Sequence, residues 1–163
     1  RFLRTLPAPP SPTELAIVCQ SVGYPVNVGS IFRIADALNA AEVLLTGITP
    51  TPPNPTIAKV ARDKEQRVPW RYFAQPEEAL RALRDRGFWL AALEITEDAL
   101  PYYTVDYPGR VALVLGNEDH GVTRSCLSLC HTALYVPMYG KGKSLNVHVS
   151  LAVVGYHLLH RGA

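Results

Sequence analysis

The sequence has few cysteines, few charges and no long uninterrupted apolar run. Its three cysteines form no even disulfide framework, and without a signal peptide at the start we expect a cytoplasmic protein in a reducing compartment. No apolar stretch is long enough to span a bilayer, so no membrane contact is expected. Cys126, Cys130 and His131 have no second ligand pair at zinc spacing, which argues against a metal site. We expect the two cysteines, one helical turn apart, to be small core residues.

Charged residues make up only 18% of the chain and give a formal net charge of +2. The length of 163 residues suits one domain with a sizeable core, and the composition is that of an ordinary globular protein. The basic residues nevertheless cluster, at Lys59, Arg62, Lys64, Arg67 and Arg71. From composition alone this cluster is either a set of solvated helix faces or a surface that follows phosphates.

Short apolar runs alternate with segments of helical periodicity. We predict strands over residues 15–22, 42–48, 71–74, 88–95, 110–115 and 132–138, and helices over 28–39, 56–65, 76–87, 123–130 and 145–160. Asn27 is expected to cap the first helix and Gly87 to end the third. Continuous apolar strands that alternate with helices predict an α/β domain with a mainly parallel sheet flanked by helices.

The last predicted helix is apolar on two faces. One stripe contains Val149 and Tyr156, and the other contains Leu151, Val154 and Leu158. A helix with two apolar faces is buried on both sides. We expect one face to pack on the sheet and the other on a partner chain, with a helix enclosed inside the monomer as the alternative.

A glycine-rich basic segment, residues 136–150, precedes this helix and reads VPMYGKGKSLNVHVS. Gly142-Lys143-Ser144 looks like the end of a phosphate-binding loop, but Pro137 occupies the position of that loop's first glycine. Proline lacks the N–H that the phosphate cradle requires. A dinucleotide fingerprint also fails, because Leu145 stands where its third glycine belongs.

Three segments are more specific together than any one alone. They read Asn-x-Gly-Ser-x-x-Arg at residues 27–33, Leu-Gly-Asn-Glu-x-x-Gly at 115–121, and Pro-Met-x-Gly-x-x-x-Ser-Leu-Asn-Val at 137–147. In this order, and with no gap within a motif, they resemble the SpoU (TrmH-like) family of RNA ribose 2′-O-methyltransferases in the SPOUT superfamily. The resemblance extends over about residues 14–160, nearly the whole chain.

The resemblance implies a fold, a cofactor and an assembly. Residues 1–13 would be a tail, and residues 14–163 a SPOUT-type catalytic domain with a C-terminal deep trefoil knot. The enzyme would be a homodimer with its active site completed across the interface, and Gly140 and Gly142 would serve a tight turn of the knot. S-adenosyl-L-methionine would be held by the loops of the second and third motifs, at Leu115, Gly116, Asn117, Gly121, Val136, Pro137, Met138, Gly140, Ser144 and Leu145.

The same resemblance implies catalytic roles without a metal ion. Arg33 would act either as a base assisted by the substrate phosphate or as a cation that fixes the phosphate and stabilises the developing alkoxide. A free guanidinium has a pKa above about 12 and rarely loses its proton, so both roles stay open. Asn27 would position Arg33 or the ribose, and Glu118 would pair with an arginine or orient the substrate. Ser144 and Asn146 would form hydrogen bonds near the reacting centre; otherwise they are simple helix caps.

The substrate implied is RNA, with tRNA favoured over ribosomal RNA. Arg62 and Arg67, together with Arg33, are the expected RNA contacts, and phosphate contacts of this kind give affinity without choice of sequence. The alternative is a catalytically silent dimeric α/β module that binds RNA or cofactor.

Overall fold

A seven-stranded sheet in the order β3-β2-β1-β6-β4-β7-β5 forms the centre of the molecule. The structure is a computed structural model that describes residues 8–161. Every strand pair is parallel. The strands are β1 (Glu14–Gln20), β2 (Glu42–Thr46), β3 (Trp70–Phe73), β4 (Trp89–Leu93), β5 (Leu100–Pro101), β6 (Arg110–Leu115) and β7 (Thr132–Tyr135). The predicted α/β class and parallel sheet are confirmed, and β5 lies in a segment predicted to be a loop.

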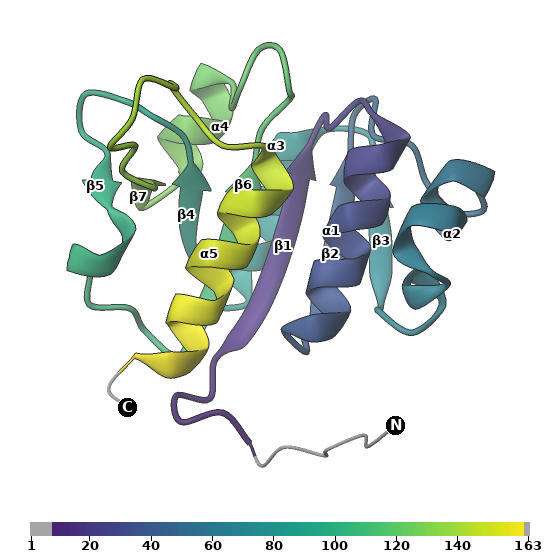
Figure 1. Cartoon of the computed structure of the whole chain (residues 1–163), viewed down its shortest axis with the longest axis horizontal. Coiled ribbons are helices and arrows are strands. Elements are labelled where there is room, and N and C mark those ends of the chain that lie inside the picture. Colours follow the sequence, from purple (N-terminus) through teal and green to yellow (C-terminus); the bar gives the residue numbers. More distant parts are fainter. Residues whose placement is uncertain (1–7, 162–163) are drawn as a thin grey trace.

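Helices cover both faces of the sheet (Figure 1). On one face lie α1 (Pro25–Ala37) and α5 (Val147–His160), with α2 (Pro55–Ala61) packed against α1. On the other face lie α3 (Pro76–Asp85) and α4 (Arg124–Leu129). Two short 3₁₀ turns, η1 (Lys64–Gln66) and η2 (Tyr102–Thr104), complete the fold.

The sequence of β1 is apolar without alternation because both faces of the strand are buried. Leu15, Ile17 and Cys19 point into the core under α1 and α5, whereas Ala16 and Val18 point into the core under α3 and α4. All five are essentially inaccessible to solvent. Full burial of a Leu, Ile or Val side chain contributes about 1.5–3 kcal/mol, so a strand covered on both faces favours an unbroken apolar run.

Two predicted helix ends are wrong, and one is confirmed. Helix α1 begins at Pro25, whose fixed φ suits the first helical position, so Asn27 lies inside the first turn and is not the cap. The predicted helix over 56–65 ends at Ala61, because Arg62 and Asp63 adopt left-handed φ values of 51° and 63°. Gly87, with a φ of 83°, directly follows the end of α3, as predicted.

The two apolar stripes of α5 differ in burial. Leu151, Val154 and Leu158 are fully buried against the sheet. Val149 and Tyr156, on the other stripe, are exposed, at 36% and 45% of their maximum. One apolar stripe of α5 therefore packs on the sheet, whereas Val149 and Tyr156 of the other stripe are accessible in the single chain.

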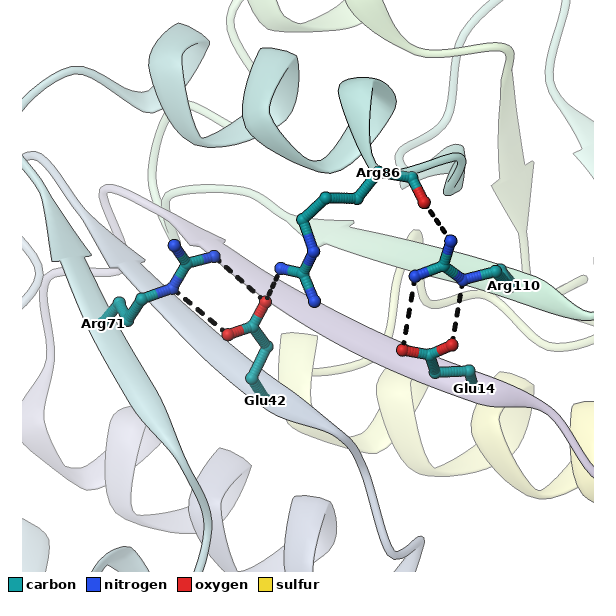
Figure 2. Close-up of polar contacts among 5 residues, drawn as sticks. All are labelled: Glu14, Glu42, Arg71, Arg86 and Arg110. Carbon is teal, nitrogen blue, oxygen red and sulfur yellow. Dashed lines mark hydrogen bonds and ion pairs between the residues drawn. The ribbon is translucent and has the colours of Figure 1, made fainter.

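The amino-terminal edge of the sheet is held by an ion-pair network (Figure 2). Arg71 donates to both carboxylate oxygens of Glu42, at 3.2 and 3.1 Å, and Arg86 donates to the same carboxylate. Arg110 donates to Glu14 at 2.9 Å and also to the backbone carbonyl of Arg86. Arg71 belongs to the basic run of the sequence, and its ion pair favours a structural role over contact with phosphate.

Both ends of the described chain meet beside α5. The Ser11 N–H donates to the Leu159 carbonyl at 3.0 Å, and the Arg161 guanidinium donates to the Thr13 hydroxyl at 2.7 Å. Residues 1–7 of the predicted tail lie outside the described residues. Cys126 is buried and Cys130 packs beside it in the layer of α3 and α4, as predicted. Among residues 8–161 no helix is both long and apolar enough to cross a membrane.

We predict that Glu42→Gln lowers the free energy of unfolding by about 1–2 kcal/mol at pH 7, because two charge-assisted pairs at a partly exposed site are weakened. Burial raises the pKa of the Glu42 carboxyl, but hydrogen bonds from Arg86 and Arg71 outweigh it and leave this pKa below its usual value. The stabilisation is therefore present above the ordinary glutamate pKa of about 4.3 and is lost as the pH falls through the lowered pKa of the folded state.

Urea denaturation at pH 7 and pH 3 measures this effect. Glu97→Gln, at an exposed loop position, serves as the control and should change stability by less than about 0.5 kcal/mol. The difference between Glu42→Gln and the unchanged protein should be smaller at pH 3 than at pH 7, and a difference of equal size at both pH values would contradict the assignment.

Candidate active site

The order of the strands reverses beside β1. The chain runs from β1 outward through β2 to β3, whereas β6 lies on the other side of β1. In register, Cys19 at the end of β1 pairs with Leu115 at the end of β6, so the following loops, residues 21–24 and 116–122, leave the same edge. Ligands of open parallel sheets bind at the carboxyl edge, where such a reversal separates two loops.

A cavity of about 460 Å³ lies at this edge. Its wall comes from the first turn of α1, the ends of β4, β6 and β7, and the segment that enters α5. The lining residues are Asn27, Leu93, Glu94, Ile95, residues 116–121, residues 134–136, residues 144–147 and Ser150.

Glu118 connects the loop after β6 to the start of α1. Its carboxylate accepts hydrogen bonds from the Gly23 N–H at 2.8 Å, the Tyr24 N–H at 2.9 Å and the Asn27 side-chain amide at 2.7 Å. Gly23 and Tyr24 directly precede Pro25, the first residue of α1, and the helix dipole favours a negative charge at this end. Glu118 thus serves as the anionic cap of α1 from a distant part of the chain.

These contacts decide the charge of Glu118. Burial raises the pKa of the carboxyl, but the hydrogen bonds from Asn27, Gly23 and Tyr24 lower it more, and the net pKa is below the usual value. Glu118 is therefore ionised at neutral pH. Within this chain the Asn27 side-chain amide binds Glu118, and its expected role of positioning Arg33 or the ribose stays a prediction.

Asn117 fastens the two loops to each other. Its side-chain amide donates to the Ser21 carbonyl at 2.7 Å, and its side-chain oxygen accepts from the N–H groups of Asp119 and His120 at 2.9 and 3.0 Å. Backbone bonds in both directions, at 3.1 and 2.8 Å, pair Asn117 with Gly121 and close the turn.

Two glycines allow this turn to fold tightly. A Cβ at Gly116 would lie 2.4 Å from the Gly121 carbonyl carbon and 2.5 Å from the Val122 nitrogen. Gly121 has a φ of 69°, and a Cβ there would lie 2.1 Å from a Glu94 carboxylate oxygen. At Gly116 the close backbone approach is therefore made by atoms of the same loop.

Glu94, which the motifs did not indicate, lies in the cavity wall at the end of β4. Its carboxylate accepts hydrogen bonds from the Val122 N–H at 2.9 Å and the Ile95 N–H at 3.0 Å. A polar residue directly after a buried strand was the available signal, because the carboxyl ends of parallel strands share one edge. Leu93, Leu134 and Tyr135, at the ends of β4 and β7, also line the cavity and were not predicted as site residues.

The cavity gathers most, but not all, of the predicted site residues. Residues lining it from the predicted set are Asn27, Gly116, Asn117, Glu118, Gly121, Val136, Ser144, Leu145 and Asn146. Leu115 is fully buried in β6, and Pro137, Met138 and Gly140 lie in the next segment, outside the lining. Asn146 directly precedes α5, but its side chain makes no capping hydrogen bond within residues 8–161.

Gly140 and Gly142 show no local feature that requires glycine, and their role in a turn of the knot stays a prediction. Neither has a positive φ in the described chain. A Cβ at Gly140 would meet no atom of the described residues within 4 Å, and one at Gly142 would only touch the Met138 methyl at 3.5 Å. Local backbone geometry therefore gives no steric reason for glycine at either position.

Arg33 stands apart from the cavity. It is exposed on α1, six residues after Asn27, which corresponds to about 9 Å along a helix axis. In the described chain it does not line the cavity and forms no hydrogen bond or ion pair. Arg62 and Arg67 are exposed beyond α2, and Arg67 pairs with Asp36 at 3.5 Å.

The fold and the site define a class: a parallel α/β domain with a small-molecule cavity at the point where the strand order reverses. The family model described as the SpoU rRNA Methylase family matches residues 14–156. The chain belongs to this family, and the resemblance inferred from the three motifs is confirmed.

Relatives of established activity cover most of the chain. A tRNA (guanosine(18)-2′-O)-methyltransferase of Thermus thermophilus is 33% identical over 141 residues, which are 86% of this chain and 72% of that protein. The 23S rRNA (guanosine-2′-O-)-methyltransferase RlmB of Ralstonia nicotianae is 36% identical over 141 residues, which are 85% of this chain and 55% of that protein.

The fold is shared with a solved methyltransferase. The SpoU methyltransferase AviRb from Streptomyces viridochromogenes, in complex with the cofactor AdoMet, superposes with a TM-score of 0.81 at 22% identity. The match covers 91% of this chain and 60% of that one, so this chain is shorter than the AviRb chain.

We predict that Glu118→Ala lowers the free energy of unfolding by about 2 kcal/mol, because three hydrogen bonds to a charged group are lost. Since the pKa of Glu118 is lowered, this contribution is present above about pH 4.3 and disappears as the pH falls through the lowered value. Hydrogen exchange at neutral pH should show faster exchange of the Gly23 and Tyr24 amides.

Asp119→Asn is the matched control, because the Asp119 carboxylate accepts only the exposed Tyr24 hydroxyl, at 3.3 Å. Equal protection of the Gly23 and Tyr24 amides in Glu118→Ala and the unchanged protein would refute the capping role.

Proposed function

We propose that this protein transfers a methyl group from S-adenosyl-L-methionine to a ribose 2′-hydroxyl of RNA. The observation that carries the proposal is the convergence of all three motifs on one cavity, through Asn27, Glu118, Ser144 and Asn146. The family assignment and the two curated relatives, which methylate guanosine 2′-oxygens, support it.

The charges of the cavity fit the cofactor. Three carboxylates, from Glu94, Glu118 and Asp119, lie in its wall, and no lysine or arginine of the described chain does. This arrangement favours a ligand that carries positive charge, such as a sulfonium with an ammonium group, and disfavours a triphosphate. The volume of about 460 Å³ also falls within the usual range for small-molecule sites.

Residues of the second and third motifs would hold the cofactor. Gly116, Val136 and Leu145 offer backbone and apolar contacts, and Glu94 keeps the turn at residues 121–122 in place. The bound cofactor supplies a methyl group activated by a positively charged sulfur. This methyl group would be the one transferred to the ribose 2′-oxygen, and the residues of the cavity wall would hold the cofactor in place for that transfer.

Arg33 is our candidate catalytic residue, supplied by a second copy of the chain. Its exposure on α1 keeps it from the cavity of its own chain, whereas the exposed side chains Val26, Val149 and Tyr156 give α1 and α5 an apolar surface suited to a homodimer. A guanidinium placed there would bind the phosphate of the target nucleotide and stabilise the developing alkoxide. Release of the proton to water or to a neighbouring group completes the step.

A C-terminal trefoil knot belongs to the same proposal. The segment between β7 and α5 passes the loop at residues 116–121, and both line the cavity. Threading of this segment through that loop would fix the two sides of the cofactor site relative to each other.

For the RNA substrate we favour tRNA. The tRNA-modifying relative matches over 72% of its own length, compared with 55% for the relative that modifies ribosomal RNA. A domain of this size therefore corresponds to a larger part of the tRNA enzyme.

The first test incubates the protein with tritiated S-adenosyl-L-methionine and either total tRNA or total ribosomal RNA, followed by nuclease mapping of the label. We expect label on a tRNA ribose. Label on ribosomal RNA alone would support the proposed reaction but identify ribosomal RNA, and not tRNA, as the substrate. Cofactor binding without transfer to either RNA would favour the catalytically silent module.

We predict that Arg33→Ala reduces methyl transfer by at least about 100-fold, because a cation that acts on the transition state is removed. The affinity of the Arg33→Ala protein for S-adenosylhomocysteine, measured by calorimetry, should stay within about twofold of that of the unchanged protein, since Arg33 does not line the cavity of its own chain. A parallel loss of affinity would contradict a catalytic role.

Mixing two inactive variants tests the shared site. Gly116→Val should abolish cofactor binding, because its Cβ would clash with the Gly121 and Val122 backbone. After the Arg33→Ala and Gly116→Val proteins are denatured and refolded together, mixed dimers contain one intact site and should recover up to about a quarter of the original activity. No recovery, with mixed dimers demonstrated by differential tags, would place each Arg33 in its own chain's site.

A further inference from the structure

The chain between β7 and α5 forms a loop at the rim of the candidate active site. Residues 134–136 before it and residues 144–147 after it line the cavity, whereas residues 137–143 lie outside the lining. We call residues 137–143 the rim loop, which crosses from β7 to the start of α5 (Figure 1). Because both of its ends are in the cavity wall, whatever binds the rim loop lies next to the cavity.

The rim loop carries an aromatic ring that takes almost no part in the core. Tyr139 is 89% exposed, the largest fraction among the large apolar side chains of the described chain. Tyr103 of η2, also more than half exposed, lies beside it, and a hydrogen bond with Tyr139 raises the pKa of the Tyr103 hydroxyl above its usual value. The Tyr102 ring meets Tyr103 edge to face at 5.3 Å and His157 of α5 at 5.2 Å. The two exposed tyrosines therefore form an accessible aromatic surface with a packed support.

The same loop is positively charged. Lys141 and Lys143 follow Tyr139, both are exposed, and neither forms an ion pair in the described chain. No aspartate or glutamate follows Asp119 in the sequence, so the loop has no acidic sequence neighbour. The adjoining cavity wall, in contrast, contains three carboxylates and no lysine or arginine of residues 8–161. A polyanion is therefore attracted to the rim and repelled from the interior.

Aromatic and basic side chains on one accessible loop suit single-stranded RNA. Proteins bind such strands by stacking bases on aromatic rings and by placing cations beside the phosphates. A second copy of this chain fits the surface less well, because the cores of protein–protein interfaces are poor in lysine. The charge of the rim loop therefore favours RNA as its partner.

The rim loop lies within reach of a nucleotide at the cavity. Lys143 directly precedes Ser144, which lines the cavity, and Tyr139 is three residues from Val136, which also lines it. Three residues of extended chain span at most about 11 Å. An RNA strand whose ribose enters the cavity can thus place a neighbouring nucleotide on the loop.

We propose that Tyr139, Lys141 and Lys143 form a platform for the single-stranded RNA next to the methylated nucleotide. A base stacks on the Tyr139 ring, Tyr103 positions that ring, and the two lysines contact phosphates. The platform does not read sequence, since every base has a face that can stack and phosphate contacts carry no sequence information. This inference rests on the proposed RNA substrate but needs neither cofactor nor methyl transfer.

Fluorescence anisotropy of a labelled uridine 12-mer, without methyl donor, measures the stacking contact. We expect Tyr139→Ala to weaken binding by at least about fivefold at every salt concentration, and Tyr139→Phe to stay within about twofold of the unchanged protein. Tyr72→Ala is the matched control, because Tyr72 is a half-exposed tyrosine on β3, at the opposite end of the sheet. The thermal unfolding midpoint of Tyr139→Ala should be unchanged, since the ring is exposed.

The salt dependence of binding measures the phosphate contacts. When Lys141→Gln and Lys143→Gln are combined, the slope of log K against log salt concentration should become smaller by about 1.4, because each contact with a single strand contributes about 0.7. Arg81→Gln, at an exposed position of α3, removes a charge elsewhere and should leave the slope unchanged. Inorganic polyphosphate, which has no bases, should compete more weakly for the lysine double variant but equally well for Tyr139→Ala.

Three results would overturn the platform. If the variants bind the 12-mer as the unchanged protein does, RNA binding stands but the platform is wrong. If the unchanged protein does not bind the 12-mer, the platform is wrong, and if total tRNA and ribosomal RNA also fail to bind, the proposed function fails with it. A change of Tyr139→Ala from dimer to monomer in sedimentation would instead assign the rim loop to a subunit interface.

Discussion

The ionised carboxylate of Glu118 is the interaction on which the site depends. It joins two segments more than ninety residues apart in sequence, the loop after β1 and the loop after β6. By capping α1 it fixes the direction in which that helix leaves the sheet, and by holding Asn27 it forms one wall of the cavity. The same hydrogen bonds lower the pKa of Glu118 and keep it ionised. One side chain therefore both orients α1 and contributes negative charge to the cavity.

The remaining parts of the site are arranged around this contact by close backbone packing. Asn117 ties the two loops at Ser21, and Gly116 and Gly121 let the turn between them fold back on itself. Glu94 then holds the far side of that turn from the end of β4. The ends of β1, β4 and β6 thus contribute to one wall, an arrangement that suits a site which must align three atoms for a displacement reaction.

The sequence was sufficient for six of the seven strands and for the motif residues that line the cavity, but not for the contacts between them. Periodicity and composition predicted the parallel strands, because strands covered on both faces need unbroken apolar runs. They could not predict that Asn27 would bind Glu118 instead of capping α1, since capping by a distant anion leaves no local pattern. Glu94 was missed because its neighbours in space are far away in the chain. The early end of α2 was missed because Arg62 and Asp63 adopt left-handed backbone without the glycine that usually signals it.

The pairing of β1 with β6 also has a consequence for how the chain folds. On one side β1 pairs with β2, which is followed by β3, and all three come from the first half of the chain. On its other side, residues 14–19 pair with residues 110–115 of β6. Contacts of such long sequence separation carry a large loop-closure cost and form slowly. A partly folded chain, or one still emerging during synthesis, can therefore have its first helices and strands in place while it lacks any cofactor cavity. Binding competence should appear late and all at once, when β6 docks beside β1.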